Sequence, residues 1–144
     1  MRKVRLGLIL VALGCAEPTV TSPRLGVPTI VGQRQNNSYS INAADLTVYV
    51  TLAELRGEGE PVHAFMRRMF ASADSAGARR LVIDLRSIMG SDARLLVPLI
   101  KGVVTRDRFV QPGGLVLVVG THSFSPAQNA ATLLRQYANP GLVY

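Results

Sequence analysis

The alternation of strand-like and helix-like segments after residue 45 narrows the possible folds to one class. Runs rich in β-branched, aromatic and aliphatic residues predict strands at 46–52, 80–85 and 115–119. Helices are predicted after each of them, at 61–73, 92–106 (where Pro98 and Gly102 can kink or shorten the helix) and 125–138. Three such repeats predict an α/β domain with a parallel sheet and right-handed crossover helices, in a three-layer-like arrangement.

Two of the predicted helices have a clear apolar face. The first carries apolar residues at spacings of three and four, namely Val62, Phe65, Met66, Met69, Phe70 and Ala73. The last is predicted to place on one face Ala130, Leu133, Leu134 and Tyr137. Because ligand sites in parallel sheets lie beyond the carboxyl ends of the strands, we expect any chemistry in the loops at 84–92 and 120–126.

Composition excludes several classes of protein. The chain has 144 residues, 48% hydrophobic and 17% charged, so it can bury one core and offset its conformational entropy. Its single cysteine excludes a disulfide framework and a zinc site built from several thiolates. Two distant histidines and no paired carboxylates leave no metal-binding cluster, and no glycine-rich phosphate loop opens a predicted helix. No metal or cofactor is therefore expected.

The N-terminus has the layout of a bacterial secretory signal peptide. A basic head at 1–5 precedes an apolar run at 6–13, which is much shorter than the roughly 20 residues of a membrane-spanning helix. Residues 12–15, Ala-Leu-Gly-Cys, resemble a lipobox, so Cys15 is predicted to become the lipidated N-terminus of an envelope lipoprotein. The alternatives are an ordinary secreted protein and a buried N-terminal strand that contains the cysteine.

This interpretation divides the chain into three parts. They are a lipoprotein-type signal peptide at 1–14, a flexible tether at 15–42 that is rich in Pro, Thr, Ser and Gly, and a domain at 43–144. Loss of the signal peptide leaves 13 basic against 9 acidic residues, which lowers the net charge from +7 to +4. Nucleic acid is therefore not an expected partner, and the pairs Arg67-Arg68 and Arg79-Arg80 are not interleaved with aromatic residues.

Two motifs follow predicted strands in the order found in a known family. Residues 80–86 read Arg-Leu-Val-Ile-Asp-Leu-Arg and are followed by Gly90; the next strand ends at Gly120 and leads to Ser-Phe-Ser-Pro-Ala-Gln-Asn-Ala at 123–130. Over roughly residues 45–144 the chain resembles the tail-specific serine peptidases, the carboxy-terminal-processing and tricorn-type enzymes. That family has a strand ending in Asp-Leu-Arg, a glycine pair, and a second strand leading to Thr-Phe-Ser-Ala-Ala-Glu or Gln. The resemblance implies a ClpP/crotonase-like core, here C-terminally incomplete.

The resemblance also implies roles for two residues. Ser125 falls on the family's nucleophile, and it precedes a proline at a predicted helix N-terminus, where N–H groups and the helix dipole favour an alkoxide. An ordinary N-cap serine looks the same in sequence. Gly90 falls on the first glycine of the pair, an oxyanion-hole donor, whereas Ser91 replaces the second glycine. Asp84 and Arg86 are expected to set the structure of the loop.

A serine nucleophile also needs a general base, which the family pattern does not supply within this chain. The family uses a downstream lysine, or an upstream histidine with a downstream glutamate. His122 lies three residues from Ser125 and is a candidate base that the family pattern does not predict. His63 and Lys101 are expected to be surface residues. Residues 142–144 look like the start of a further strand, so we expect a truncated or degenerate member with weak or no peptidase activity.

Three functions of different class remain. The first is an envelope or secreted serine-type peptidase that cleaves unfolded or extended peptides through an acyl-enzyme, with Ser125 as nucleophile. The second is a catalytically silent envelope lipoprotein that binds peptides or protein partners with the same scaffold. The third is a basic nucleic-acid binder, which has the least support.

Overall fold

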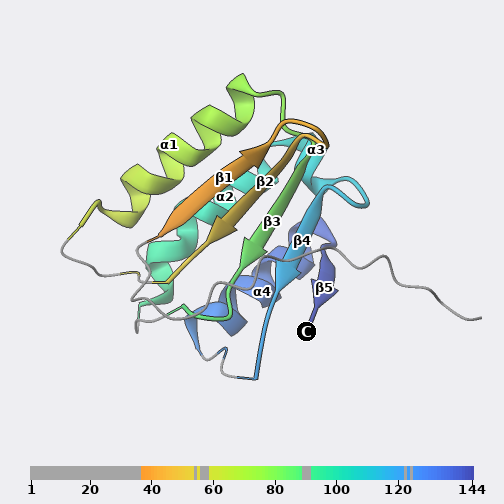
Figure 1. Ribbon diagram of the computed structural model, residues 1–144. Helices are drawn as coiled ribbons and strands as arrows, with labels where there is room; N and C mark the ends of the chain where they lie inside the picture. The colour runs from red at the N-terminus through yellow and green to blue at the C-terminus, as the bar shows by residue number, and fades with distance from the viewer. Residues whose placement is uncertain (1–36, 54, 56–58, 89–91, 122, 124) are drawn as a thin grey trace, which may run out of the picture. The chain divides into compact units, whose positions relative to one another are not determined.

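The computed structural model describes residues 37–53, 55, 59–88, 92–121, 123 and 125–144, all of which lie within the unit Gly32–Tyr144. This unit contains five strands and a set of helices (Figure 1). In chain order the elements are β1 (Ser38–Asn42), β2 (Thr47–Thr51), α1 (Val62–Ser75), β3 (Arg80–Asp84), the 3₁₀ helix η1 (Ala93–Leu96), α2 (Val97–Val104), α3 (Asp107–Val110), β4 (Leu115–Val118), α4 (Pro126–Ala138) and β5 (Gly141–Val143).

The strands form one mixed sheet in the order β1-β2-β3-β4-β5. Strands β2 to β5 run parallel to one another, and β1 pairs antiparallel with β2. The predicted α/β fold with a mostly parallel sheet is therefore confirmed, as are the three predicted strands and the start of a further strand. The carboxyl ends of the parallel strands are level, because the register aligns Thr51, Asp84, Val118 and Val143.

Strand β1 corrects the predicted tether, which was expected to extend to residue 42. Its side chains alternate: Tyr39 and Ile41 pack against the core, whereas Ser38, Ser40 and Asn42 are exposed. The Tyr39 ring contacts Phe65 of α1 at 5.8 Å between centroids, and its hydroxyl is 2.9 Å from the Ser72 hydroxyl. An edge strand of this length with one solvated face needs only two apolar residues. The mainly polar sequence therefore did not indicate a strand here.

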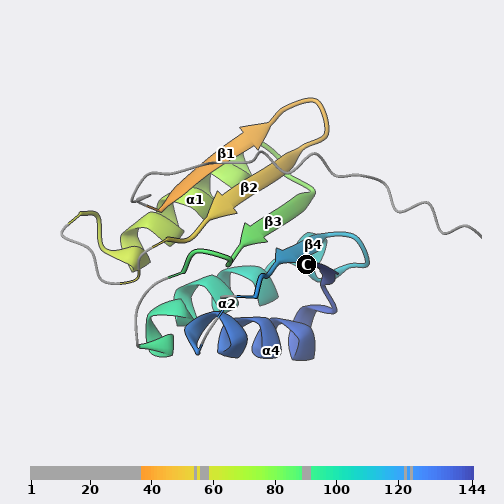
Figure 2. The same ribbon diagram turned by 60° about the horizontal axis from the view of Figure 1, so that its bottom comes forward.

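The helices lie on one face of this sheet, so the described residues form two layers instead of the expected three-layer-like arrangement. Helix α2 packs between α1 and α4, and both figures place α2 and α4 on the same side of the strands (Figures 1 and 2). The reason is topological: strands that are added in sequence order in one direction, with crossovers of one hand, place every crossover helix on the same face.

The core lies between this helical layer and one face of the sheet. The apolar stripe predicted for α1 is confirmed, since all six of its residues are buried. Helix α2 lies close to α1 at Gly102, where a Cβ atom would overlap the Phe70 ring. Glycine therefore lets the two helices pack in contact, even though it lowers the intrinsic stability of a helix interior.

Two predicted helices differ in detail from those in the structure. The segment 92–106 is divided into η1 and α2, with Pro98 in the first turn of α2, where a missing N–H costs no helical hydrogen bond. In α4 the core face consists of small residues and one leucine: Pro126, Ala127, Ala130, Leu134 and Ala138. Leu133 and Tyr137, expected on that face, are 38% and 56% exposed, because the alanine stripe brings a neighbouring strip of the helix into the core.

No helix in the described part of the chain is long and apolar enough to cross a bilayer. The longest, α1, has 14 residues, and a membrane-spanning helix needs roughly 20.

Candidate functional site

The candidate site lies at the level carboxyl edge of the parallel strands. The hydrogen-bond ladder continues one residue beyond the strands, from Leu85 N–H to the Val118 carbonyl (2.9 Å) and from Val119 N–H to the Val143 carbonyl (3.0 Å). The chain therefore leaves β3 and β4 at the same height. The loops after these two strands are the ones in which the sequence predicts chemistry.

An ion pair shapes the loop after β3. The Asp84 carboxylate accepts the backbone N–H of Arg86 (3.0 Å). It also accepts hydrogen bonds from the Arg86 guanidinium, from Nε to both Oδ1 (3.0 Å) and Oδ2 (3.1 Å) and from Nη2 to Oδ2 (2.6 Å). These side-chain hydrogen bonds raise the pKa of Arg86. The stem of Arg86 passes close to Gly120, where an added Cβ would lie 3.3 Å from Arg86 Cγ. Asp84 and Arg86 therefore have the geometry of a loop-building pair that also reaches the loop after β4.

Ser123 joins the two loops from within. It is buried, and its Oγ accepts the N–H of Gly120 (3.0 Å) and donates to the carbonyl of Leu85 (3.3 Å). Its own N–H donates to the Gly120 carbonyl at 3.0 Å. Sequence reasoning gave no role to this serine. The only available signal was a hydroxyl two residues before Ser125, in a loop that has to return to the end of a neighbouring strand.

Ser125 occupies the N-cap position of α4 but does not act as an ordinary cap. Its carbonyl accepts the first helical hydrogen bond, from Asn129 N–H at 2.9 Å. Its exposed side chain makes no cap hydrogen bond, and the backbone has φ 20° and ψ −79°. A non-glycine residue at positive φ carries strain of about 1–3 kcal/mol, and such strain is concentrated at functional sites. The hydroxyl is thus exposed on a strained strand-to-helix turn, beside the N–H groups of the first turn.

Gly90, which the resemblance places in the site, and His122, the candidate base, lie outside the described residues, as does the predicted lipidation site Cys15. His63 and Lys101 are exposed on α1 and α2, as expected of surface residues. Among the described residues, no group of three or more His, Cys, Asp or Glu side chains is arranged to hold a metal ion.

A pocket of about 410 Å³ lies beside the loop after β4. Gly120 and Ser123 form part of its wall, and α4 contributes Gln128, Thr132 and Arg135. The size is at the lower end of the range for small-ligand sites. The pocket runs along α4 from Gln128, in the first turn of the helix, to Arg135, and Ser125 is not among the described residues that line it.

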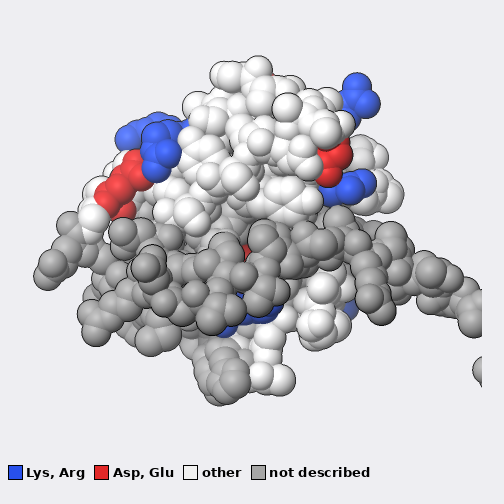
Figure 3. Space-filling view, viewed as in Figure 1, with Lys and Arg blue, Asp and Glu red and all other residues white. Residues whose placement is uncertain are grey.

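In the upper part of Figure 3, blue and red side chains lie next to one another at the left and at the right, with white surface between them. The pair Arg68–Glu60 is of this kind, with 2.6 Å between Nη2 and Oε2.

No family model matches the chain, and no curated protein matches it. The resemblance to tail-specific peptidases therefore rests on the residues quoted above.

Proposed function

We propose that the chain is a serine-type peptidase-like protein of the bacterial envelope in which Ser125 accepts the acyl group of an extended peptide. The observation that carries the proposal is the state of Ser125: an exposed hydroxyl without a cap hydrogen bond, on a residue with φ 20°, at a strand-to-helix turn. A serine with only a structural role would satisfy its hydroxyl with the first-turn N–H groups. This serine leaves its hydroxyl available and pays a cost in backbone strain.

The proposed reaction is ordinary acyl transfer. The Oγ of Ser125 attacks the peptide carbonyl carbon and forms a C–O bond, while a base takes the hydroxyl proton. The tetrahedral intermediate then expels the amine, which receives that proton, and water hydrolyses the resulting ester. His122 is the proposed base and the N–H of Gly90 a proposed oxyanion donor. The first-turn N–H groups of α4 add favourable electrostatics for the developing negative charge.

The alternative is a catalytically silent peptide-binding scaffold. One observation favours it: within the described residues, no base is hydrogen-bonded to the Ser125 hydroxyl. In that case the pocket beside α4 would bind peptides without cleaving them. The level carboxyl edge and the bonded loops would serve only to shape that pocket.

A fluorophosphonate probe separates these two functions. An activated serine forms a bond to the probe's phosphorus and expels fluoride, so labelled protein is detected by mass spectrometry at Ser125. We expect labelling of the purified chain, none of Ser125→Ala, and normal labelling of Ser87→Ala, an exposed serine in the loop after β3. Labelling slowed at least about 100-fold in His122→Ala would support the proposed base. No labelling of the wild-type chain, with peptide binding retained in Ser125→Ala, would favour the silent scaffold.

Membrane attachment through Cys15 is part of the same proposal. It is supported by the sequence layout at 1–15. Expression of the full chain in bacteria, followed by detergent partitioning, should place the wild type in the detergent phase and Cys15→Ser in the aqueous phase. A wild type that remains aqueous would favour an ordinary secreted protein.

A further inference from the structure

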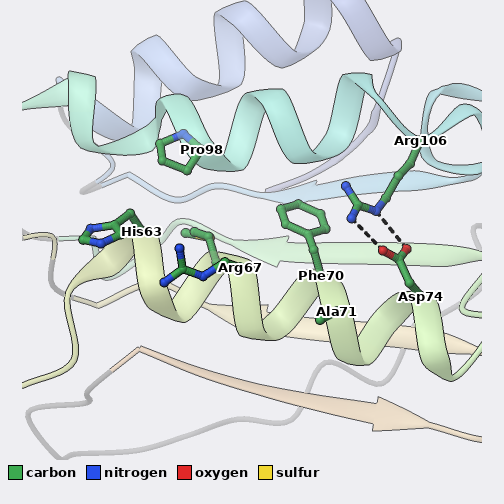
Figure 4. Close-up of a pocket in the computed structure, with 8 residues that line it drawn as sticks. His63, Arg67, Phe70, Ala71, Asp74, Pro98 and Arg106 are labelled. Atoms are coloured by element: carbon green, nitrogen blue, oxygen red, sulfur yellow. Dashed lines mark hydrogen bonds and ion pairs between the residues drawn. The ribbon is translucent and has the colours of Figure 1, made fainter.

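A second hollow lies away from the strand edge, in the groove between α1 and α2. Its volume is about 360 Å³. Residues from one side of α1 line it, since positions 63, 67, 70 and 74 are separated by one helical turn each. Pro98 of α2 and Arg106, which follows α2, form the opposite wall (Figure 4).

The apolar wall of this groove is held in place by its neighbours. The Phe70 ring lies against Gly102, and the guanidinium of Arg106 lies 4.5 Å from the ring centroid. Phe70 also contacts Phe109, at 6.5 Å between centroids. Met66, which lines the groove with Phe70, is 1% exposed. A wall fixed in this way binds an apolar group without first having to be ordered.

At one end of the groove lies Asp74, whose carboxylate is paired with two arginines. Asp74 accepts two hydrogen bonds from Arg106, at 2.9 and 2.7 Å, and is also paired with Arg108. Hydrogen bonds from these two arginines lower the pKa of Asp74 to about 2, and those from Arg106 have the larger effect. The only carboxylate among the described lining residues is therefore already paired with two arginines, and it does not balance the charge of Arg67 at the other end.

The other end carries His63 and Arg67, whose positions differ by four residues and so lie on one face of α1. Figure 4 shows both side chains together at this end, on the opposite side of Phe70 from the Arg106–Asp74 pair. Neither has a hydrogen bond or ion pair to any residue of the described part of the chain. Arg68, the next residue, differs from them, because its guanidinium donates hydrogen bonds to Glu60 and to the Tyr39 hydroxyl.

We propose that this groove binds a small amphipathic carboxylate, with its anionic group on Arg67 and His63 and its apolar body along Met66, Phe70 and Pro98. A guanidinium offers a planar pair of donors that matches a carboxylate. The rigid apolar wall begins one turn along the helix from that pair. The volume suits a ligand with one ring or a short alkyl chain. The site is separate from Ser125 and does not depend on the proposed peptidase function.

Titration of the purified chain with 3-phenylpropionate tests this proposal. We expect saturable binding by calorimetry with a dissociation constant of about 1 mM or lower, and amide shifts in ¹H–¹⁵N spectra confined to α1 and α2. The neutral analogue 3-phenylpropionamide should bind at least about tenfold more weakly, and acetate, which lacks the apolar body, should also bind more weakly. Equal affinity for the acid and the amide would overturn the proposal, as would shifts located elsewhere.

Two variants assign the site. Arg67→Ala should weaken binding by about 10- to 100-fold, the usual effect of losing a charged hydrogen-bond donor, whereas Arg79→Ala, which removes an exposed arginine that does not line the groove, should leave it unchanged. Ala71→Phe fills the groove from an exposed position on α1 and should abolish binding without altering any charge. Circular dichroism establishes that each variant is folded. Binding that survives in both Arg67→Ala and Ala71→Phe would refute the site.

Discussion

Replacement of Ser123 by alanine tests whether one buried hydroxyl holds the two loops of the candidate site together. The side chain is only slightly exposed, at 8% for the residue, and makes two hydrogen bonds, one to Gly120 N–H and one to the Leu85 carbonyl. Removal leaves both backbone groups without this partner, which costs about 1–3 kcal/mol when they are sealed from water. Gly120 and Ser123 line the pocket beside α4, so water can reach them and the loss should be about 1–2 kcal/mol.

Urea unfolding followed by far-ultraviolet circular dichroism measures this loss, since the chain has no tryptophan for fluorescence. The midpoint should fall with the denaturant slope unchanged, and the melting temperature should fall by about 5–10 °C for a domain of this size. Fluorophosphonate labelling of Ser125 should slow at least about tenfold, because the loop that positions it has lost an anchor. Ser87→Ala, which removes an exposed hydroxyl from the same edge, should change stability by less than about 0.5 kcal/mol. A Ser123→Ala variant as stable as Ser87→Ala would refute the reasoning.

Two further predictions concern the helical layer. Gly102→Ala should destabilise the fold by about 1–2 kcal/mol, because the new methyl group overlaps the Phe70 ring and this outweighs the better helix propensity of alanine. Urea unfolding measures the loss. Adding Phe70→Leu to this variant should recover part of it. Hydrogen bonds from Arg106 and Arg108 lower the pKa of Asp74 to about 2. The ionised side chain therefore adds to the free energy of unfolding above the unfolded pKa of 3.8, and this stabilisation is lost as pH falls through about 2. With the solvent screening of a side chain that is 43% exposed, Asp74→Asn should cost about 1 kcal/mol at pH 7 and nothing near pH 1.5, measured by thermal unfolding across pH.

The parallel part of the sheet was predictable because its strands are apolar on both faces or nearly so. Leu81, Val82 and Ile83 are consecutive and all buried, and a short apolar run of this kind is typical of a parallel strand. Strand β1 was missed because its inward residues, Tyr39 and Ile41, alternate with polar ones inside a segment rich in tether-like residues. Periodicity in five residues carries too little information to separate an edge strand from an extended linker.

Helix faces were predictable only where large residues define them. In α1 the large apolar residues form the stripe, and the structure buries all of them. In α4 the buried stripe is mainly alanine, and the larger Leu133 and Tyr137 lie beside it. Hydrophobicity alone gives greater weight to leucine and tyrosine than to alanine. Close packing of α4 in the core places its small side chains inward, so the predicted face was displaced by part of a turn.

The candidate site was predictable in its location but not in what holds it together. Strand order places the ends of β3 and β4 side by side once the sheet is known to be parallel, and the motifs at 80–86 and 123–130 then fall on one edge. The bond from Ser123 to Leu85 joins residues 38 positions apart. The contact between Gly120 and the Arg86 stem also depends on distant residues. Such contacts are set by the three-dimensional register of two loops, which no local pattern encodes.

These contacts explain how a strained residue can persist at the start of α4. Strain at one residue is retained only when the structure on both sides of it determines its position. On the strand side, Ser123 is bonded to two backbone groups and Gly120 is packed against Arg86. On the helix side, Pro126 and Ala127 are buried against the core. The backbone of Ser125 therefore has to connect two fixed ends, and the same constraints that impose its positive φ also hold its hydroxyl exposed at the carboxyl edge of the sheet.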